Sequence, residues 1–168
     1  IINSLVMMAS KFHIIHQCGQ GQYNEVKAET DRLIKEGQSH YAEAIQKNYK
    51  LFPFFDSKQM AAAYAACDLV VSRAGAGSIF EIALLGKPAV LIPITSSSGG
   101  HQLANAVEFS KFGAVYIEEE NLNPNILINQ IEALFEPVKY QEVSQKIKTF
   151  ASPDAADKIA ATLLGQSA

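Results

Sequence analysis

Residues 68–81, which read DLVVSRAGAGSIFE, constrain the fold of this chain more than any other stretch. The apolar, β-branched run at 69–71 predicts a buried strand of a parallel sheet, and residues 78–85 have the pattern of a helix. Between them lies a turn of small residues: Gly75, Ala76, Gly77 and Ser78. A strand that leads through such a turn into a helix directs backbone N–H groups and the positive end of the helix dipole at one point. The stretch therefore predicts a site for a phosphate or diphosphate, carried by a nucleotide or a nucleotide-sugar.

An interpretation without a ligand fits the same residues. Ser78 and Glu81 have the spacing of a capping box, in which the Ser78 side chain accepts from the N–H of Glu81 and the Glu81 side chain accepts from the N–H of Ser78. Short glycine motifs also occur often without any ligand. The local pattern alone favours neither the ligand site nor the capping box.

The composition is that of one globular domain. The chain has 168 residues, of which 48% are hydrophobic and 18% charged, so it can bury a core and is not disordered. A net charge of −3 gives no reason to expect nucleic-acid binding. Cys18 and Cys67 are isolated, which argues against a disulfide framework or a zinc site. No apolar run approaches the roughly 20 residues of a membrane span, so we expect a cytoplasmic protein.

Strand and helix patterns alternate along the chain. Strands are expected at residues 12–17, 50–55, 69–71, 88–94 and 114–118. Helices are expected at residues 1–9, 23–36, 58–66, 78–85 and 101–112, and helices dominate from residue 123 with breaks at Pro137 and Pro153. This alternation predicts an α/β fold with a doubly wound, Rossmann-like parallel sheet and a single domain over residues 1–168.

The predicted topology also predicts where a ligand binds. Right-handed crossovers bring the carboxyl ends of parallel strands to one edge of a sheet. The turn at Gly19, the segment 54–55, the turn at 74–78 and the Ser-Gly loop before His101 are therefore expected to meet in one crevice. Because the chain opens on a helix pattern, we further expect it to be a fragment that lacks a preceding strand and turn.

Four segments, in this order, resemble the C-terminal domain of the MurG family of bacterial glycosyltransferases. They are residues 55–64 (FDSKQMAAAY), 68–83 (DLVVSRAGAGSIFEIA), 86–93 (GKPAVLIP) and 101–106 (HQLANA). Enzymes of this family transfer N-acetylglucosamine from UDP-N-acetylglucosamine to lipid I, undecaprenyl-diphosphate-N-acetylmuramoyl-pentapeptide, which completes lipid II in peptidoglycan synthesis. The resemblance covers nearly the whole chain and implies the C-terminal, donor-binding half of a GT-B fold.

The resemblance assigns roles to several residues. Glu81 matches the acid that binds the ribose hydroxyls, and the turn at 74–78 matches the segment where a helix N-terminus meets the diphosphate. The backbone near Phe55 matches the segment that holds uracil. Three features depart from the family pattern: the glycine-rich loop expected just before Ile1 is absent, residues 57–59 look like an insertion in the uracil segment, and His101 stands where some relatives have Gln.

Further residues of the expected site lie near the end of the matching region. His101 and Gln102 match a polar pair that contacts the sugar, although some relatives have Gln where His101 stands. Asn105 is expected to fix the loop rather than to touch the ligand. Arg73 fits two roles equally, a contact with the diphosphate or a salt bridge at the strand end.

The resemblance also implies what is not in this chain. The general base and the lipid I groove belong to an N-terminal acceptor domain, so we expect no catalytic residue here and no sugar transfer by this chain alone. No metal or cofactor is expected, because the helix dipole and N–H groups would stabilise the departing UDP. The full-length protein is expected at the inner face of the plasma membrane. Two alternatives stay open: a standalone half that works with a separate partner chain, and a non-catalytic nucleotide-binding module.

Overall fold

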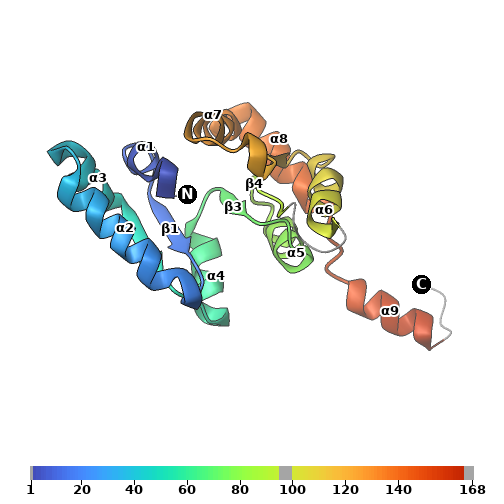
Figure 1. Ribbon diagram of the computed structural model, residues 1–168. Helices are drawn as coiled ribbons and strands as arrows, with labels where there is room; N and C mark the ends of the chain where they lie inside the picture. Colours follow the sequence, from blue (N-terminus) through green and yellow to red (C-terminus); the bar gives the residue numbers. More distant parts are fainter. Residues whose placement is uncertain (1, 95–99, 165–168) are drawn as a thin grey trace. The chain divides into compact units, whose positions relative to one another are not determined.

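The computed structural model describes residues 2–94 and 100–164, in which helices and parallel strands alternate (Figure 1). The chain divides into two compact units. The first takes in the chain up to Cys67 together with Leu122–Gln130, and the second takes in Asp68–Asn121 together with the chain from Ile131 onward. Each unit is described by itself.

The first unit is built around two parallel strands. Its elements are η1 (Ile2–Ser4), α1 (Leu5–Ala9), β1 (Ile14–Gln17), η2 (Gln20–Gln22), α2 (Tyr23–Glu36), α3 (Ser39–Asn48), β2 (Tyr49–Phe52) and α4 (Ser57–Ala66). β1 pairs with β2 from Ile14 opposite Tyr49 to Gln17 opposite Phe52. A buried cluster of Leu5, Ala9, Ile45 and Tyr49 forms the core and joins α1, α3 and β2.

The second unit contains a three-stranded parallel sheet in the order β3-β4-β5. Its elements are β3 (Val70–Ser72), α5 (Ala76–Leu85), β4 (Ala89–Leu91), α6 (His101–Ser110), β5 (Val115–Tyr116), η3 (Glu119–Asn121), α8 (Pro137–Lys148) and α9 (Ala155–Leu163). α7 (Pro124–Phe135) begins in the first unit and ends in the second. All three residues of β4 are fully buried, as is typical of a strand with a neighbour on each side and a helix layer on its faces.

The predicted α/β class with parallel strands is confirmed. The helix predicted at 23–36 has the observed bounds. The predicted breaks are also observed: α7 ends at Phe135 and Pro137 is the first residue of α8, while Pro153 lies between α8 and α9. Gly86 ends α5 in the left-handed conformation with φ of 61°. In the described part of the chain the strands form two sheets, whereas one continuous sheet was predicted. The single domain and the shared crevice stay predictions.

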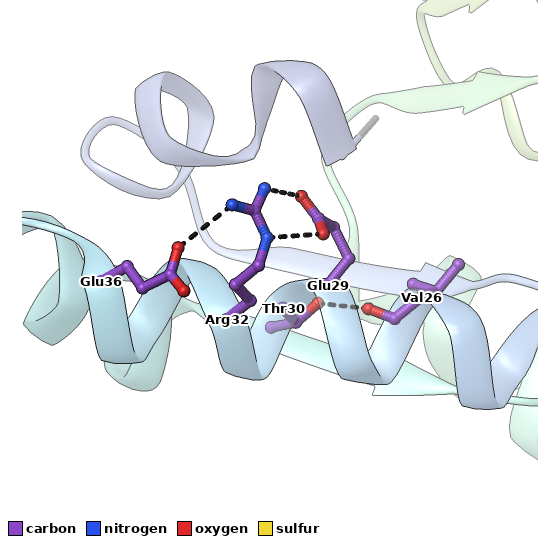
Figure 2. Close-up of polar contacts among 5 residues, drawn as sticks. All are labelled: Val26, Glu29, Thr30, Arg32 and Glu36. Atoms are coloured by element: carbon purple, nitrogen blue, oxygen red, sulfur yellow. Dashed lines mark hydrogen bonds and ion pairs between the residues drawn. The ribbon is translucent and has the colours of Figure 1, made fainter.

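Several polar side chains of α2 contact residues of the same helix. Figure 2 shows Arg32 between Glu29 and Glu36: Nε and Nη2 donate to the two oxygens of Glu29 at 2.9 and 2.6 Å, and Nη1 donates to Glu36 at 3.1 Å. The hydrogen bonds from Arg32 lower the pKa of Glu29. Thr30 Oγ1 donates to the Val26 carbonyl at 2.8 Å, one turn back. These contacts stabilise α2 and take no part in the site described next.

Candidate functional site

The turn between β3 and α5 leads directly into a helix that no side chain caps within the described residues. Ala74 is fully buried, Gly75 is the N-cap in an extended conformation, and the first main-chain bond of the helix runs from the N–H of Ile79 to the carbonyl of Gly75 at 3.0 Å. The N–H groups of the residues before Ile79 therefore have no partner inside the helix. They lie where an anion is stabilised by N–H donors and by the helix dipole.

Of the two interpretations left open for Ser78 and Glu81, the capping box does not fit the start of α5. Ala76 and Gly77 are already helical, so Ser78 is the third residue of α5 and not its N-cap. An N-cap residue needs non-helical backbone angles to turn its side chain toward the following N–H groups. Here Gly75 holds that place and has no side chain to offer.

Gly75 and Gly77 face open space. A Cβ added to either residue would meet no described atom within 4 Å, and neither residue has a positive φ. Gly75 is the N-cap, a position where glycine is common, but neither packing nor backbone conformation within the described chain explains Gly77 inside α5. Glycine inside a helix costs about 1 kcal/mol relative to alanine. A ligand that approaches the backbone closely would account for that cost.

Two side chains of α6, one turn apart, form hydrogen bonds with main-chain groups that follow β3 and β4. Asn105 Nδ2 donates to the carbonyl of Ala74 at 3.1 Å, and Gln102 Oε1 accepts from the N–H of Ile94 at 3.0 Å. The prediction that Asn105 fixes the loop is confirmed. His101 is the first residue of α6 and is exposed, following Gly100 in the left-handed conformation. Most of the Ser-Gly loop before it, residues 95–99, lies outside the described residues.

Arg73 makes a salt bridge at the strand end. Its Nη1 donates to Glu119 Oε1 at 2.7 Å and to the carbonyl of Ile92 at 3.1 Å. Both charged side chains are partly exposed, by 50% and 37%. The structure thus shows one of the two roles predicted for Arg73. A contact with a diphosphate stays a prediction, as does the role of Glu81, which is exposed on the second turn of α5.

In the first unit the predicted uracil segment is tied to the end of β1. The N–H of Phe55 donates to Gln17 Oε1 at 2.8 Å, and the buried Phe55 ring packs on Phe52 with 4.9 Å between ring centroids. No motif in the sequence marks Gln17, which is 38 residues from Phe55. Because its side chain already occupies the N–H of Phe55, a ligand has to use other main-chain atoms of this segment.

The apparent insertion at 57–59 is the first turn of α4. Asp56 is the N-cap: its Oδ1 accepts from the N–H of Gln59 at 2.8 Å, and Gln59 Oε1 accepts from the N–H of Asp56 at 3.0 Å. This is a complete capping box. Because of this capping box, α4 begins at Ser57, and only Asp56 lies between Phe55 and the helix.

His16 has a structural role in the same unit. Its Nδ1 shares a hydrogen bond of 2.7 Å with the hydroxyl of Tyr49 on β2. Burial lowers the pKa of His16 to about 4 and raises the pKa of Tyr49 to about 12, so both side chains are neutral at pH 7. Within the described ranges no group of three His, Cys, Asp or Glu side chains is placed to hold a metal ion.

Comparisons with known proteins agree on one family. The model of the glycosyltransferase family 28 C-terminal domain matches residues 3–159. The UDP-N-acetylglucosamine--N-acetylmuramyl-(pentapeptide) pyrophosphoryl-undecaprenol N-acetylglucosamine transferase of Legionella pneumophila (strain Corby) is 34% identical over 99% of this chain and 41% of its own length. The protein of the same name from Bacteroides fragilis is 43% identical over 61% of this chain and 27% of its own length.

A solved structure gives the same result. The crystal structure of Acinetobacter baumannii MurG superposes with a TM-score of 0.71 at 28% identity, over 90% of this chain and 42% of that one. The chain thus spans less than half the length of the relatives that it matches over nearly all of its own length.

Proposed function

Because this chain belongs to the family of glycosyltransferase family 28 C-terminal domains, we propose that it binds the UDP-N-acetylglucosamine donor of a transferase that makes lipid II. The N-terminus of α5 carries this proposal. There a helix without a side-chain cap begins after a buried strand, and its glycines face open space. A diphosphate placed at that point would receive N–H donors and the positive end of the helix dipole.

The chemistry of transfer follows from the same placement. When the acceptor attacks the anomeric carbon, the bond to UDP breaks and negative charge grows on the departing diphosphate. Fixed N–H groups that point at this charge stabilise it without having to reorganise. The α5 terminus would thereby supply what a divalent cation supplies in other transferases, so the proposal includes no metal and no other cofactor.

The side chains around this turn have donors and acceptors that suit a sugar nucleotide. The Glu81 carboxylate is an acceptor for the two ribose hydroxyls. The oxygen of Gln102 is occupied by the N–H of Ile94, so its amide presents N–H donors to a ligand and is suited to an acceptor oxygen of the sugar. His101 begins α6 beside Gln102 and is proposed as a second sugar contact. Main-chain atoms near Phe55 are proposed to bind uracil.

The acceptor side of the reaction is proposed to lie outside these 168 residues. The curated relatives have names that include pyrophosphoryl-undecaprenol, and this chain matches 41% of the length of one of them. An acceptor domain that binds lipid I would provide the general base. We propose that the complete enzyme works at the cytoplasmic face of the membrane, where it meets the lipid-linked acceptor. None of the helices in residues 2–94 and 100–164 has the length and apolar character that a bilayer crossing requires.

The test is UDP binding by Glu81→Gln, measured by titration calorimetry. Gln keeps one acceptor oxygen but turns an amide donor toward a hydroxyl, so two charge-assisted hydrogen bonds weaken, and we expect a loss of about 1–3 kcal/mol in binding free energy. The melting temperature should stay unchanged. Glu142→Gln is the matched control, because Glu142 is an exposed acid on α8 of the same unit and its loss should not change UDP affinity.

The possible results separate the proposal from its details. A wild-type chain that gives no heat with UDP contradicts donor binding as a whole. If the wild type binds UDP and Glu81→Gln binds it equally well, donor binding stands and the ribose contact of Glu81 is wrong.

A further inference from the structure

The guanidinium of Arg73, just after β3, forms hydrogen bonds with groups just after the two neighbouring strands β4 and β5. Arg73 follows β3, Ile92 follows β4, and Glu119 opens η3 just after β5, in a sheet whose order is β3-β4-β5. A single nitrogen, Nη1, donates both to the Ile92 carbonyl and to Glu119 Oε1. Nη1 carries two hydrogens, so these bonds use it completely. A direct contact between Arg73 and a ligand would be left to Nε and Nη2.

The next residue along the chain is held as well. The carbonyl of Ala74 accepts from Asn105 on α6, and the methyl group of Ala74 is fully buried. Gly75 and Gly77, which follow, have no side chains and face open space, so they add no anchor of their own. The place where α5 begins therefore depends on the two residues before its N-cap Gly75, Arg73 and Ala74.

From this arrangement we propose that Glu119 is a positioning residue for the diphosphate end of the donor site. Glu119 holds Arg73, and Arg73 holds the strand end from which the N-terminus of α5 projects toward the ligand. This inference rests on the proposed function and adds to it a residue that acts through another side chain. Among the described residues, Glu119 is the acid of the run at 118–120 that forms a salt bridge with an arginine.

The opposite interpretation is a competition for Arg73. If Arg73 bound the diphosphate directly, Glu119 would compete with the ligand for the same guanidinium and would repel it by its own charge. Removal of the Glu119 charge would then strengthen UDP binding. If Glu119 positions the turn, the same change weakens UDP binding. The two interpretations predict opposite signs.

Glu119→Gln and Glu120→Gln make the matched pair for this experiment. Both variants remove one negative charge at adjacent positions, but the side chain of Glu120 is exposed and only Glu119 pairs with Arg73 among the described residues. With UDP as the probe at one fixed salt concentration, we expect Glu119→Gln to bind about two- to fivefold more weakly than the wild type, the range of a partly exposed ion pair. Glu120→Gln should bind as the wild type does, or slightly more tightly because of its lost charge.

A second readout does not depend on the ligand. The N–H of Ile79 bonds to Gly75, and the N–H of Ile92 bonds to Ser72, so hydrogen exchange at these amides reports on the start of α5 and on the β3–β4 edge. We expect faster exchange at both amides in Glu119→Gln and unchanged exchange in Glu120→Gln. Each variant is first checked for its folded circular dichroism spectrum.

The results that overturn the inference are specific. The positioning role is contradicted if Glu119→Gln binds UDP as tightly as Glu120→Gln or more tightly. It is also contradicted if hydrogen exchange at the Ile79 and Ile92 amides is unchanged in Glu119→Gln. The affinity result requires a wild type that binds UDP, so it leaves the proposed function intact, whereas the exchange result is read without UDP. A wild type without UDP binding contradicts the donor site itself, and the positioning role with it.

Discussion

His16 lies on β1 with Nδ1 2.7 Å from the hydroxyl of Tyr49, and burial lowers its pKa from 6.5 to about 4. The unfolded chain therefore takes up a proton near pH 6.5 that the folded chain takes up only near pH 4. Between these values the unfolded state binds more protons, so stability increases with pH. The contribution of His16 is complete above about pH 6.5 and is lost as the pH falls toward 4.

We predict that His16→Asn reduces this pH dependence. Between pH 7 and pH 5 the free energy of unfolding of the wild type should fall by about 1–2 kcal/mol more than that of the variant, because a histidine kept neutral by burial loses that amount at pH 5. Urea unfolding at the two pH values measures the difference. His13→Asn is the control, since His13 is exposed and precedes the strand, and it should keep the wild-type slope. Equal slopes in His16→Asn and the wild type would contradict the assignment.

Single residues were predicted best where a motif already defined their neighbourhood. Asn105 lies in the short motif at 101–106, and its expected role of fixing a loop agrees with its hydrogen bond to the carbonyl of Ala74. The partners of Phe55 and Arg73 were not predicted, because Gln17 is 38 residues from Phe55 and Glu119 is 46 residues from Arg73. A local pattern shows that a donor is present, but it does not show which distant acceptor the fold brings to it.

At the scale of elements, the helix starts give a direct test. We predict that Asp56→Ala lowers the free energy of unfolding by about 0.5–2 kcal/mol, because it removes the N-cap of α4 and leaves the N–H of Gln59 without its acceptor. Ser78→Ala should have almost no effect, since Ser78 is inside α5 and caps nothing. Chemical denaturation of the two variants measures both values. A larger loss in Ser78→Ala than in Asp56→Ala would mean that the two helix starts are assigned the wrong way round.

The same pair shows why element boundaries were only partly predicted. Asp56 with Gln59 and Ser78 with Glu81 have the same spacing, and either pair fits a capping box. What separates them is whether the preceding residues are already helical, which the pattern does not encode. The strand predicted at 88–94 is shorter in the structure, from Ala89 to Leu91: these three residues pair with β3, and the last two of them also pair with β5. Helix α3 was not predicted, since its apolar residues are few.

At the scale of the whole molecule, we predict that this chain alone transfers no sugar. The proposed donor site holds UDP-N-acetylglucosamine, but the acceptor and the general base are proposed to lie in the part of the relatives that the chain does not match. Release of UDP in the presence of a lipid I analogue should equal the rate without protein, while UDP binding persists. The full-length relative from Legionella pneumophila serves as the positive control in the same assay. Turnover by the 168-residue chain would contradict the division of roles.

The alternation of strands and helices was enough to predict the class of the whole molecule and the parallel direction of its strands. The number of sheets was not predictable in this way. Strand pairing depends on contacts between residues far apart in the sequence, such as Ile14 with Tyr49 or Val90 with Val115, and a pattern read along the chain does not contain them.

Gly77 has a practical consequence for anyone who engineers this protein for heat resistance. An alanine at this position fits the backbone and the surrounding space, and the helix should gain about 0.5–1 kcal/mol from it. Any screen for thermal tolerance would therefore favour Gly77→Ala early. On the proposed function, however, its methyl group would stand where the diphosphate of the donor comes closest to the main chain. The most heat-resistant version of this protein and the version that holds its substrate best are then expected to be different molecules.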